Sequence, residues 1–528
     1  MYRGEIPEAS VTYNVVGNTN ERGLVIAETT YGGAPILGSR YQPDGVLDYG
    51  SLIYVALQRS RTARDAIGTM TSLLDEHGYA SSGESFSLAD ASGEVWILEV
   101  IGRGGTGRRG AAWVARRVPD GAVSAHANQA RITTFPRDDP ENCLYSDDVV
   151  DLAVSVGLYN RTSGSRDNEE DADFSFSDVY DPVTFLGARA CEARVWSVFR
   201  AISDDPSFGD RYANYAAGRN LTNRMPLWIT PKKVLDLSDV AELMSSHYES
   251  SPLAFDSDVG AGAHSAPYRP RPLEWKYGDG TYVNERAVAT QQTGWNFIGQ
   301  VRTTVPPPLT SLLWFGVDDS STSPRYPVYG CSTWVSAAYG GLGTQDGVRA
   351  PVLDFDLTKA FWVQNMVSNL AYSRWDEVYP VVREKIHDIA DAHAAEVEQI
   401  DRRALDMKSE EAVEFVTSYS VAAGNALHSD WLTFYGALFA RFRDGYDIVP
   451  KEDNVQCGCD IRTPGLSDGW RDRIVKETGS QYKVIGDSGG GDHSDPTDDD
   501  DDGPVDWRTS LDGVGGVMDS KLDLVALK

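Results

Sequence analysis

Apolar and polar residues alternate along the first quarter of the chain with the period of two that is typical of β-strands. Residues 11–30 predict a strand, a turn at residues 17–20 and a second strand. Residues 84–132 predict an antiparallel meander. Its strands cover residues 85–88, 95–100, 112–115 and 123–127. The glycine-rich stretch 102–110 predicts a hairpin loop, because it lacks the Gly-Lys-Ser/Thr ending of a phosphate-binding loop.

Other segments show the spacing of apolar residues that is typical of helices. Residues 51–78 and 182–201 predict helices on this ground. From about residue 359 onward the pattern is again helical, with one long segment at 381–407 and a second at 411–442.

Two further strand candidates, residues 287–301 and 312–317, lie between these helical regions. Strands and helices therefore occur in separate groups, and the regular β-α-β alternation of a parallel sheet is absent. This arrangement predicts an α+β fold with layered antiparallel sheets.

The composition indicates a folded protein with a disordered end. Hydrophobic residues make up 41% and charged residues 24% of the 528 residues, so the chain can bury a sizeable core. After about residue 485 the composition shifts to Gly, Asp, Ser and Pro, with consecutive aspartates at residues 498–502. Such a segment cannot form a packed core, so residues 486–528 predict a disordered acidic tail.

Charge and hydropathy exclude two kinds of partner. The net charge is −30, and nucleic-acid binding needs basic patches, so no nucleic acid is expected as a partner. No run of 18 or more apolar residues occurs, so no membrane span is expected. Residues 1–10 lack an apolar segment and predict no signal peptide. Localisation and oligomeric state stay open, and the sequence is compatible with a homo-oligomer.

The sequence gives little support for metal or cofactor chemistry. It has no His-Glu-x-x-His motif, and His387 and His393 are six residues apart, which does not place them on one helix face. Cys457 and Cys459 lack the second pair that would complete a zinc site. Cys331 predicts a buried thiol, because nothing around it resembles a nucleophile motif. We therefore expect no metal and no cofactor.

Two segments combine strand-like sequence with a dense set of polar groups. In Ser124–Ile132 an Asn, a Gln and an Arg follow a predicted strand, and Asn284–Gly294 is similar. Such groups are costly to bury unless they meet partners or a ligand. A structural polar network and a functional site both explain them.

A series of longer blocks resembles the dipeptidase A family, a branch of the amino-terminal nucleophile hydrolases. The blocks are VTYNVVGNTNERGLVIAETTYGG (11–33), DYGSLIYVALQRSRTARDAI (48–67), SSGESFSLAD (81–90), GEVWILEVIGRG (93–104), SAHANQARI (124–132), ENCLYSDDVV (141–150), CEARVWSVFR (191–200), MPLWITP (225–231), PYRPRPLEW (267–275), NERAVATQQTG (284–294) and LLWFGVDDSST (312–322). The resemblance runs from about residue 10 to about residue 485, and this many ordered blocks make it specific.

The family implies a four-layer αββα fold, in which two antiparallel sheets pack between helical layers. Applied to this chain, residues 1–380 form the amino-terminal nucleophile hydrolase core without its first strand. Residues 381–485 form the C-terminal helical part of the same catalytic region, and the tail from residue 486 lies outside the resemblance.

The family's chemistry uses a cysteine at the mature amino terminus. Its thiolate attacks the peptide carbonyl and its own α-amine serves as the base, so neither a histidine nor a cofactor is needed. The resemblance therefore implies a cysteine-type dipeptidase whose substrates are dipeptides.

Carried over to this sequence, the family's site falls on the polar segments. Asn128, in HANQAR, is the expected oxyanion donor, and the strand through Thr30 is expected to lend a backbone N–H. Arg194 is expected to orient the catalytic groups, and Arg189 and Arg131 to bind a substrate carboxylate. A structural ion pair is the alternative for each arginine.

The sequence departs from the family at the nucleophile. None of its five cysteines precedes Cys143, and the family's opening strand is absent. A truncated start is the favoured explanation; a catalytically inactive relative and a strand supplied by another chain are the alternatives.

Two other functions stay open at this point. One is a non-catalytic binding or regulatory protein on the same fold, as for the related secernins. The other is an acylase that acts on non-peptide amides, as in the choloylglycine-type hydrolases. The residues in the matching blocks favour the dipeptidase over the acylase.

Overall fold

The computed structural model describes residues 4–38, 45–161, 171–341, 351–455 and 457–485. The chain divides after Leu466 into two compact units. In the second unit, the side chain of Ser467 caps α12 (Asp468–Thr478) by accepting a hydrogen bond from the Trp470 N–H. The predicted acidic tail lies outside the described residues.

The first unit contains a seven-stranded sheet in which all neighbouring strands are antiparallel. In spatial order its strands are β1 (Val15–Val16), β2 (Thr19–Asn20), β3 (Val25–Tyr31), β4 (Gly83–Ala89), β5 (Val95–Gly102), β6 (Ala111–Arg117) and β8 (Cys143–Tyr145). The strand predicted at residues 123–127 is shorter than expected. It forms only β7 (Val123–Ser124), which pairs with β9 (Trp228–Ile229) outside this sheet.

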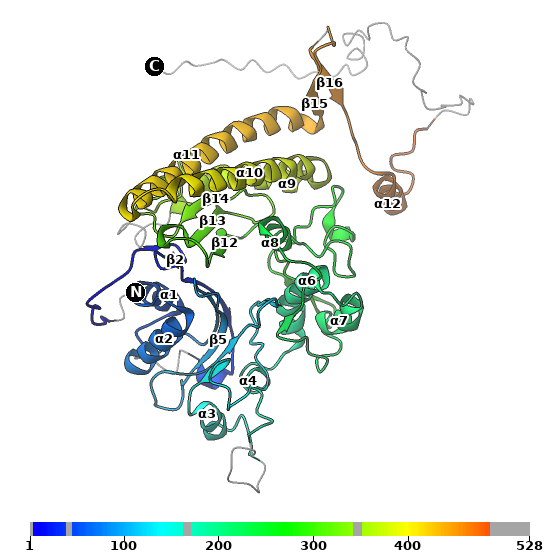
Figure 1. Cartoon of the computed structure of the whole chain (residues 1–528). Helices are drawn as coiled ribbons and strands as arrows, with labels where there is room; N and C mark the ends of the chain where they lie inside the picture. The colour runs from blue at the N-terminus through cyan, green and yellow to red at the C-terminus, as the bar shows by residue number, and fades with distance from the viewer. Residues whose placement is uncertain (1–3, 39–44, 162–170, 342–350, 456, 486–528) are drawn as a thin grey trace. The chain divides into compact units, whose positions relative to one another are not determined.

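Two helices cover one face of the seven-stranded sheet (Figure 1). They are α1 (Tyr49–Arg59) and α2 (Ala63–His77), which together replace the single helical segment predicted over residues 51–78. Met70 of α2 and Phe86 of β4 belong to one buried apolar cluster. The burial of apolar side chains on this face explains why alternation predicted the strands β3 to β6 well.

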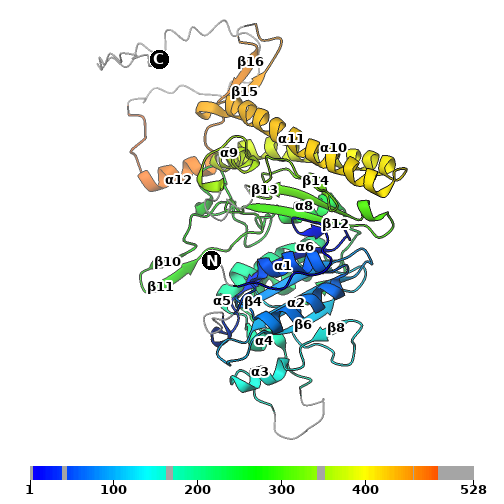
Figure 2. The same cartoon turned by 90° about the vertical axis from the view of Figure 1, so that its left-hand side faces the viewer.

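A second antiparallel sheet lies in the later part of the unit. Its strands are β12 (Trp295–Val301), β13 (Ser311–Val317) and β14 (Tyr326–Tyr329). The strand predicted at residues 287–301 is therefore present only in its second half. Three long helices cover one face of this sheet (Figures 1 and 2). They are α9 (Ala360–Ser373), α10 (Trp375–Ala404) and α11 (Ser409–Phe442).

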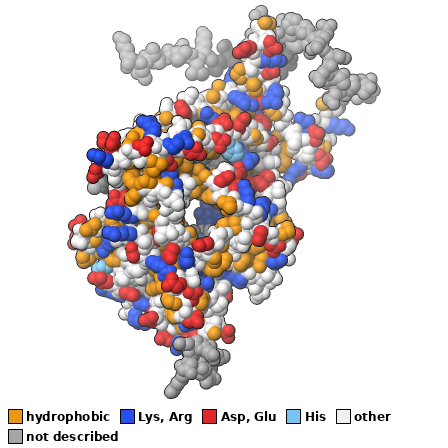
Figure 3. Space-filling model, viewed as in Figure 1, with side chains coloured by type: hydrophobic (Ala, Val, Ile, Leu, Met, Phe, Trp, Pro, Cys, Tyr) orange, Lys and Arg blue, Asp and Glu red, His pale blue; other side chains and the backbone are white. Residues whose placement is uncertain are grey.

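The two sheets meet at one end. The Thr19 hydroxyl on β2 donates a hydrogen bond to Ser311 Oγ on β13 at 3.1 Å. Val16 of β1 packs against another apolar cluster, which contains Leu313 of β13. The space-filling view is hollowed near the middle of this unit, and Lys or Arg atoms line the bottom of the hollow (Figure 3).

The first unit also contains shorter elements. They are α3 (Val149–Ser155), α4 (Phe176–Tyr180), α5 (Phe185–Gly187), the π-helix η3 (Ala188–Glu192), α6 (Ala193–Ile202), α7 (Phe208–Ala216), α8 (Leu237–Met244), the hairpin β10 (Glu274–Tyr277) and β11 (Gly280–Val283), and the hairpin β15 (Asp447–Pro450) and β16 (Cys459–Arg462). Cys457 and Cys459 form a disulfide at the last hairpin. Among the described helices, none has the length and apolar character needed to cross a bilayer.

Candidate active site

The segment around Asn128 crosses the end of β3. The Gln129 N–H donates to the Ala127 carbonyl at 2.7 Å, which forms a tight turn with Asn128 at its centre. The Thr29 hydroxyl donates to the Ala127 carbonyl at 3.0 Å, and Asn128 Nδ2 donates to the Thr30 carbonyl at 2.6 Å. These contacts hold the Asn128 amide against the backbone of β3.

Thr30 presents its backbone to an open edge of β3. The Ile26 N–H donates to the Asn18 carbonyl at 3.0 Å on the side away from β4, and residues an even number apart in a strand point the same way. The N–H and carbonyl of Thr30, four residues on, therefore face that side. β2 pairs with β3 only at the first residue of β3, so among the described strands none occupies the edge from residue 27 to residue 31.

Two arginines fix the orientation of Asn128. Its Oδ1 accepts hydrogen bonds from Arg194 Nη2 at 2.8 Å and from Arg286 Nη1 at 3.3 Å. A guanidinium only donates, so the amide oxygen has to face the arginines and the amide nitrogen has to face Thr30. The structure thus brings the predicted residues Asn128, Thr30 and Arg194 together, and it adds Arg286 to them.

Arg194 is positioned by an irregular helix. It follows the π-helix η3, and its Nε donates to the carbonyl of Ala190 within that helix at 2.9 Å. Single π-helical turns leave carbonyls exposed to other donors and are frequent at functional sites. The irregularity therefore aims the Arg194 guanidinium at Asn128.

Arg131 is separate from this group and forms a buried ion pair. Its Nε lies 3.1 Å from Glu192 Oε1, and both side chains are 1% exposed. Its two Nη atoms donate to the carbonyls of Ala125 and Pro226 at 2.9 and 2.7 Å. Because these donors are satisfied inside the protein, the geometry favours the structural ion pair over the predicted carboxylate site.

Arg189 also has a carboxylate partner within the chain. It pairs with Glu285, which lies in the polar segment Asn284–Gly294. Burial lowers the pKa of Arg189. The pair joins η3 to that segment, which is the structural alternative considered for this arginine.

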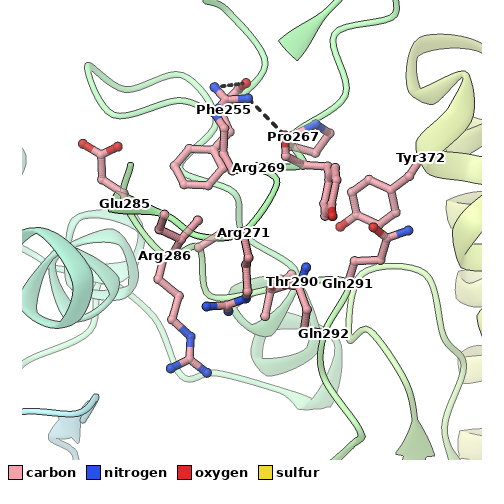
Figure 4. A pocket seen from close by; sticks show the side chains of 14 residues that line it. Phe255, Pro267, Arg269, Arg271, Glu285, Arg286, Thr290, Gln291, Gln292 and Tyr372 are labelled. Atoms are coloured by element: carbon pink, nitrogen blue, oxygen red, sulfur yellow. Dashed lines mark hydrogen bonds between the residues drawn. The ribbon is translucent and has the colours of Figure 1, made fainter. Parts of the chain in front are cut away.

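Two arginines outside the predicted set, Arg271 and Arg286, line a pocket together with Tyr372 of α9 (Figure 4). Burial and the nearby charges of Arg194 and Arg271 lower the pKa of Arg286. Both residues lie in sequence blocks that carried the family resemblance, 267–275 and 284–294. Neither block showed that the two side chains lie close to each other.

The side chain of Thr30 is directed to the helix-covered face of the sheet. Its hydroxyl donates to Glu84 Oε2 at 3.1 Å, and Glu84 is completely buried. Burial and a hydrogen bond with Glu28 raise the pKa of Glu84 well above its usual range. Only the backbone of Thr30 is therefore available beside Asn128.

One group of three potential metal ligands occurs among the described residues, away from this site. The ligand atoms of His264, Asp376 and Glu377 lie within 4.8 Å of one another. Glu377 already pairs with Arg374, and both acids lie in the first turn of α10, where the helix dipole favours anions. Ordinary ion pairing accounts for this group.

The chain is similar to known peptidases over most of the first unit. Residues 1–388 match the model of peptidase family C69. The chain is 21% identical over 399 residues to dipeptidase A of Lactobacillus helveticus, a match that covers 75% of this chain and 72% of that protein. It is 21% identical over 365 residues to a probable dipeptidase of Latilactobacillus sakei, which covers 67% of this chain and 64% of that protein. A dipeptidase of Bifidobacterium longum is 27% identical over 246 residues, or 44% of this chain and 41% of that protein.

The match over residues 1–388 defines the class of this protein, which is a peptidase. The chain belongs to peptidase family C69. The resemblance to the dipeptidase A family, predicted from the ordered sequence blocks, is confirmed by these matches.

Proposed function

We propose that this protein is a cysteine-type dipeptidase whose nucleophile is an amino-terminal cysteine beyond the 528 residues of this sequence. The proposed fold is the four-layer αββα sandwich of the amino-terminal nucleophile hydrolases. The observation that carries the proposal is the open edge of β3 at Thr30, directly beside the amide of Asn128. A strand that paired with this edge would bring its end close to both groups.

Asn128 and Thr30 would supply the oxyanion side of the reaction. The Asn128 amide nitrogen carries two hydrogens and gives one to the Thr30 carbonyl, which leaves the second for an oxyanion. The N–H of Thr30 faces the same edge. Arg194 and Arg286 polarise the amide through its oxygen, which strengthens the N–H donor. Donors of this kind stabilise the negative charge of the tetrahedral intermediate.

The proposed reaction has two stages. The cysteine thiol gives its proton to the α-amine and attacks the peptide carbonyl, and the α-amine then protonates the departing amino acid. Water next attacks the thioester, gives a proton to the α-amine and releases the second amino acid. The thiol is restored when that proton returns to sulfur.

The thiols of the present chain are poorly suited to be the nucleophile. The three free cysteines, Cys143, Cys191 and Cys331, are all buried. Burial raises the pKa of Cys143 to about 11 and that of Cys331 to about 12. It raises the pKa of Cys191 as well. The attacking species is the thiolate, which these pKa values disfavour at neutral pH.

Comparing two forms of the protein tests the proposal. The gene would be read upstream of Met1, and an in-frame extension that begins with a cysteine and a strand would be expressed beside the 528-residue chain. The extended form is expected to release alanine from L-Ala-L-Ala, and a Cys→Ser variant of its first residue is expected to release none. An inactive but folded extended form would favour the non-catalytic binding or regulatory protein. Turnover by the 528-residue chain would contradict the proposed nucleophile.

A further inference from the structure

Two arginines, Arg271 and Arg286, flank the hairpin β10–β11 in the chain. Its ladder continues past the strands, because the Asn284 N–H donates to the Leu273 carbonyl at 2.9 Å. Arg271 and Arg286 follow just outside this last pair, and both line the same pocket. Figure 4 shows the two side chains extending in the same direction from the segments that flank the hairpin. Arg271 is exposed and Arg286 is half-buried, so a ligand can reach both.

Within the described part of the chain, no carboxylate pairs with either of these arginines. Arg286 donates to the neutral oxygen of Asn128, and its buried Nε has no partner. Glu285, the acid next to it in sequence, pairs with Arg189 instead. The chain carries 78 acidic and 48 basic residues, so a shortage of acids does not explain the missing counter-ion.

Arg194 adds a third positive charge beside Arg271 and Arg286. Among the described residues, Arg194 interacts with the Asn128 amide, a backbone carbonyl and the Cys191 thiol but with no carboxylate, and its charge and that of Arg271 both act on Arg286. Like charges that lie close to one another repel. An anion bound from outside the chain would offset this repulsion.

We infer that Arg271 and Arg286 bind the C-terminal carboxylate of a dipeptide, an inference that rests on the proposed function. Guanidinium groups bind carboxylates through charge-assisted, often bidentate, hydrogen bonds. In a dipeptide the carboxylate carbon lies roughly 4 Å from the scissile carbonyl carbon, about one residue spacing. The 3.3 Å contact between Arg286 Nη1 and Asn128 Oδ1 places one of the two guanidiniums beside the residue that carries the oxyanion donor.

The site would also select substrate length. A tripeptide cleaved at its first bond, or a dipeptide amide, would bring a neutral amide to the two guanidiniums. The two guanidiniums would then have no counter-ion. Leaving charged groups of a binding site unpaired strongly disfavours binding of such a ligand. Arg271 and Arg286 are therefore specificity-determining residues for free dipeptides.

Isothermal titration of the 528-residue chain with L-Ala-L-Ala and with L-alanyl-L-alaninamide tests the site. We expect the dipeptide to bind at least 10-fold more tightly than its amide. Arg271→Gln and Arg286→Gln are each expected to weaken dipeptide binding about 10-fold and to leave amide binding unchanged. Arg271→Gln is the cleaner variant, because no hydrogen bond to Asn128 is lost. Arg402→Gln, at an exposed site on α10, controls for the loss of one positive charge.

The outcomes separate this site from the proposed function. Equal affinities of the wild-type chain for the dipeptide and its amide would overturn the carboxylate site but leave dipeptide recognition intact. Binding of neither compound at 10 mM, in a chain that melts cooperatively, would overturn both. A similar loss of dipeptide binding in Arg402→Gln would show a general charge effect and would also overturn the site.

Discussion

The side-chain amide of Asn128 donates a 2.6 Å hydrogen bond to the backbone carbonyl of Thr30, at a strand edge that no described strand covers. The opposite end of the amide accepts hydrogen bonds from Arg194 and Arg286. The amide cannot turn over without setting its NH₂ group against two guanidiniums. The donor is therefore oriented before any substrate binds, which is what oxyanion stabilisation requires.

Replacing Asn128 by alanine is expected to lower both stability and activity. The 528-residue chain should lose about 1–3 kcal/mol of its free energy of unfolding, because the Thr30 carbonyl and two guanidiniums lose their partner. In the proposed extended form, kcat should fall by about 10²–10³-fold, as for removal of one oxyanion donor. Urea denaturation and release of alanine from L-Ala-L-Ala measure the two effects.

Asn369→Ala provides a matched control, because this asparagine is exposed on α9 and, among the described residues, hydrogen-bonds only to Asn365 of its own helix and to Gln291. It should change the unfolding free energy by less than about 0.5 kcal/mol. If both variants leave kcat unchanged, Asn128 is not an oxyanion donor.

Alternation of apolar and polar residues predicted β3 to β6 because one face of these strands is buried under α1 and α2. It overestimated the strand at 123–127, where only two residues pair. There the polar side chains of Asn128 and Arg131 bind backbone carbonyls and hold the chain in a turn. The pattern of neighbouring residues cannot predict such contacts, because the contact between Asn128 and Thr30 joins residues 98 positions apart.

The partners of the predicted arginines likewise depend on long-range contacts that the sequence pattern does not show. The family resemblance named Arg194 as an orienting residue and Arg131 and Arg189 as carboxylate-binding residues, with a structural ion pair as the alternative for each. The structure separates them by their partners: Glu192 for Arg131, Glu285 for Arg189 and the Asn128 amide for Arg194. The proximity of Arg271 and Arg286 was not predicted from the sequence, because the hairpin that lies between them in the chain was not predicted.

The free cysteines are expected to react slowly with iodoacetamide in the folded protein. Cys143, Cys191 and Cys331 are buried and their pKa values are raised, so little thiolate is present at pH 7. Mass spectrometry under non-reducing conditions should find fewer than one label per chain after an hour, and three labels after unfolding in urea.

Cys191 is the critical thiol in this experiment, because the positive charge of Arg194 acts on it. In the extended form, Cys191→Ser should leave the release of alanine unchanged. Rapid labelling of Cys191 together with loss of activity in that variant would show that Cys191 in η3, and not an amino-terminal cysteine, is the nucleophile.

Arg131→Met is expected to destabilise the protein strongly. The substitution leaves Glu192 as an unpaired charge whose side chain is 1% exposed, and breaking a buried pair in this way costs about 3–5 kcal/mol. The double variant Arg131→Met/Glu192→Gln should recover part of the loss, because it removes the second charge. Urea unfolding curves of both proteins, with Arg402→Met as the exposed control, measure the difference. An unchanged unfolding midpoint with a raised KM would instead support the predicted role in substrate binding.

Asp318 is expected to make stability fall as the pH rises from about 4 to 7. Burial and the neighbouring Asp319 raise the pKa of Asp318 from 3.8 to about 7. In this interval the folded protein keeps a proton that the unfolded chain releases. The contribution of the protonated carboxyl is complete below pH 3.8 and is lost as the pH approaches 7, by at most about 1.4 kcal/mol per pH unit.

Asp318→Asn should remove this dependence and stabilise the protein at pH 7 by about 1–3 kcal/mol. The backbone φ at this position is 65°, a left-handed conformation that asparagine tolerates, and the amide oxygen can still accept from Asn365. Asp319→Asn is the contrasting variant. Its carboxylate accepts from the Ser321 N–H at 2.9 Å and from the Tyr372 hydroxyl at 2.6 Å, so the amide should destabilise the protein at every pH. Urea midpoints between pH 4 and pH 8 distinguish the two. A loss of stability in Asp318→Asn that is equal at both ends of the range would mean that Asp318 is ionised in the folded protein.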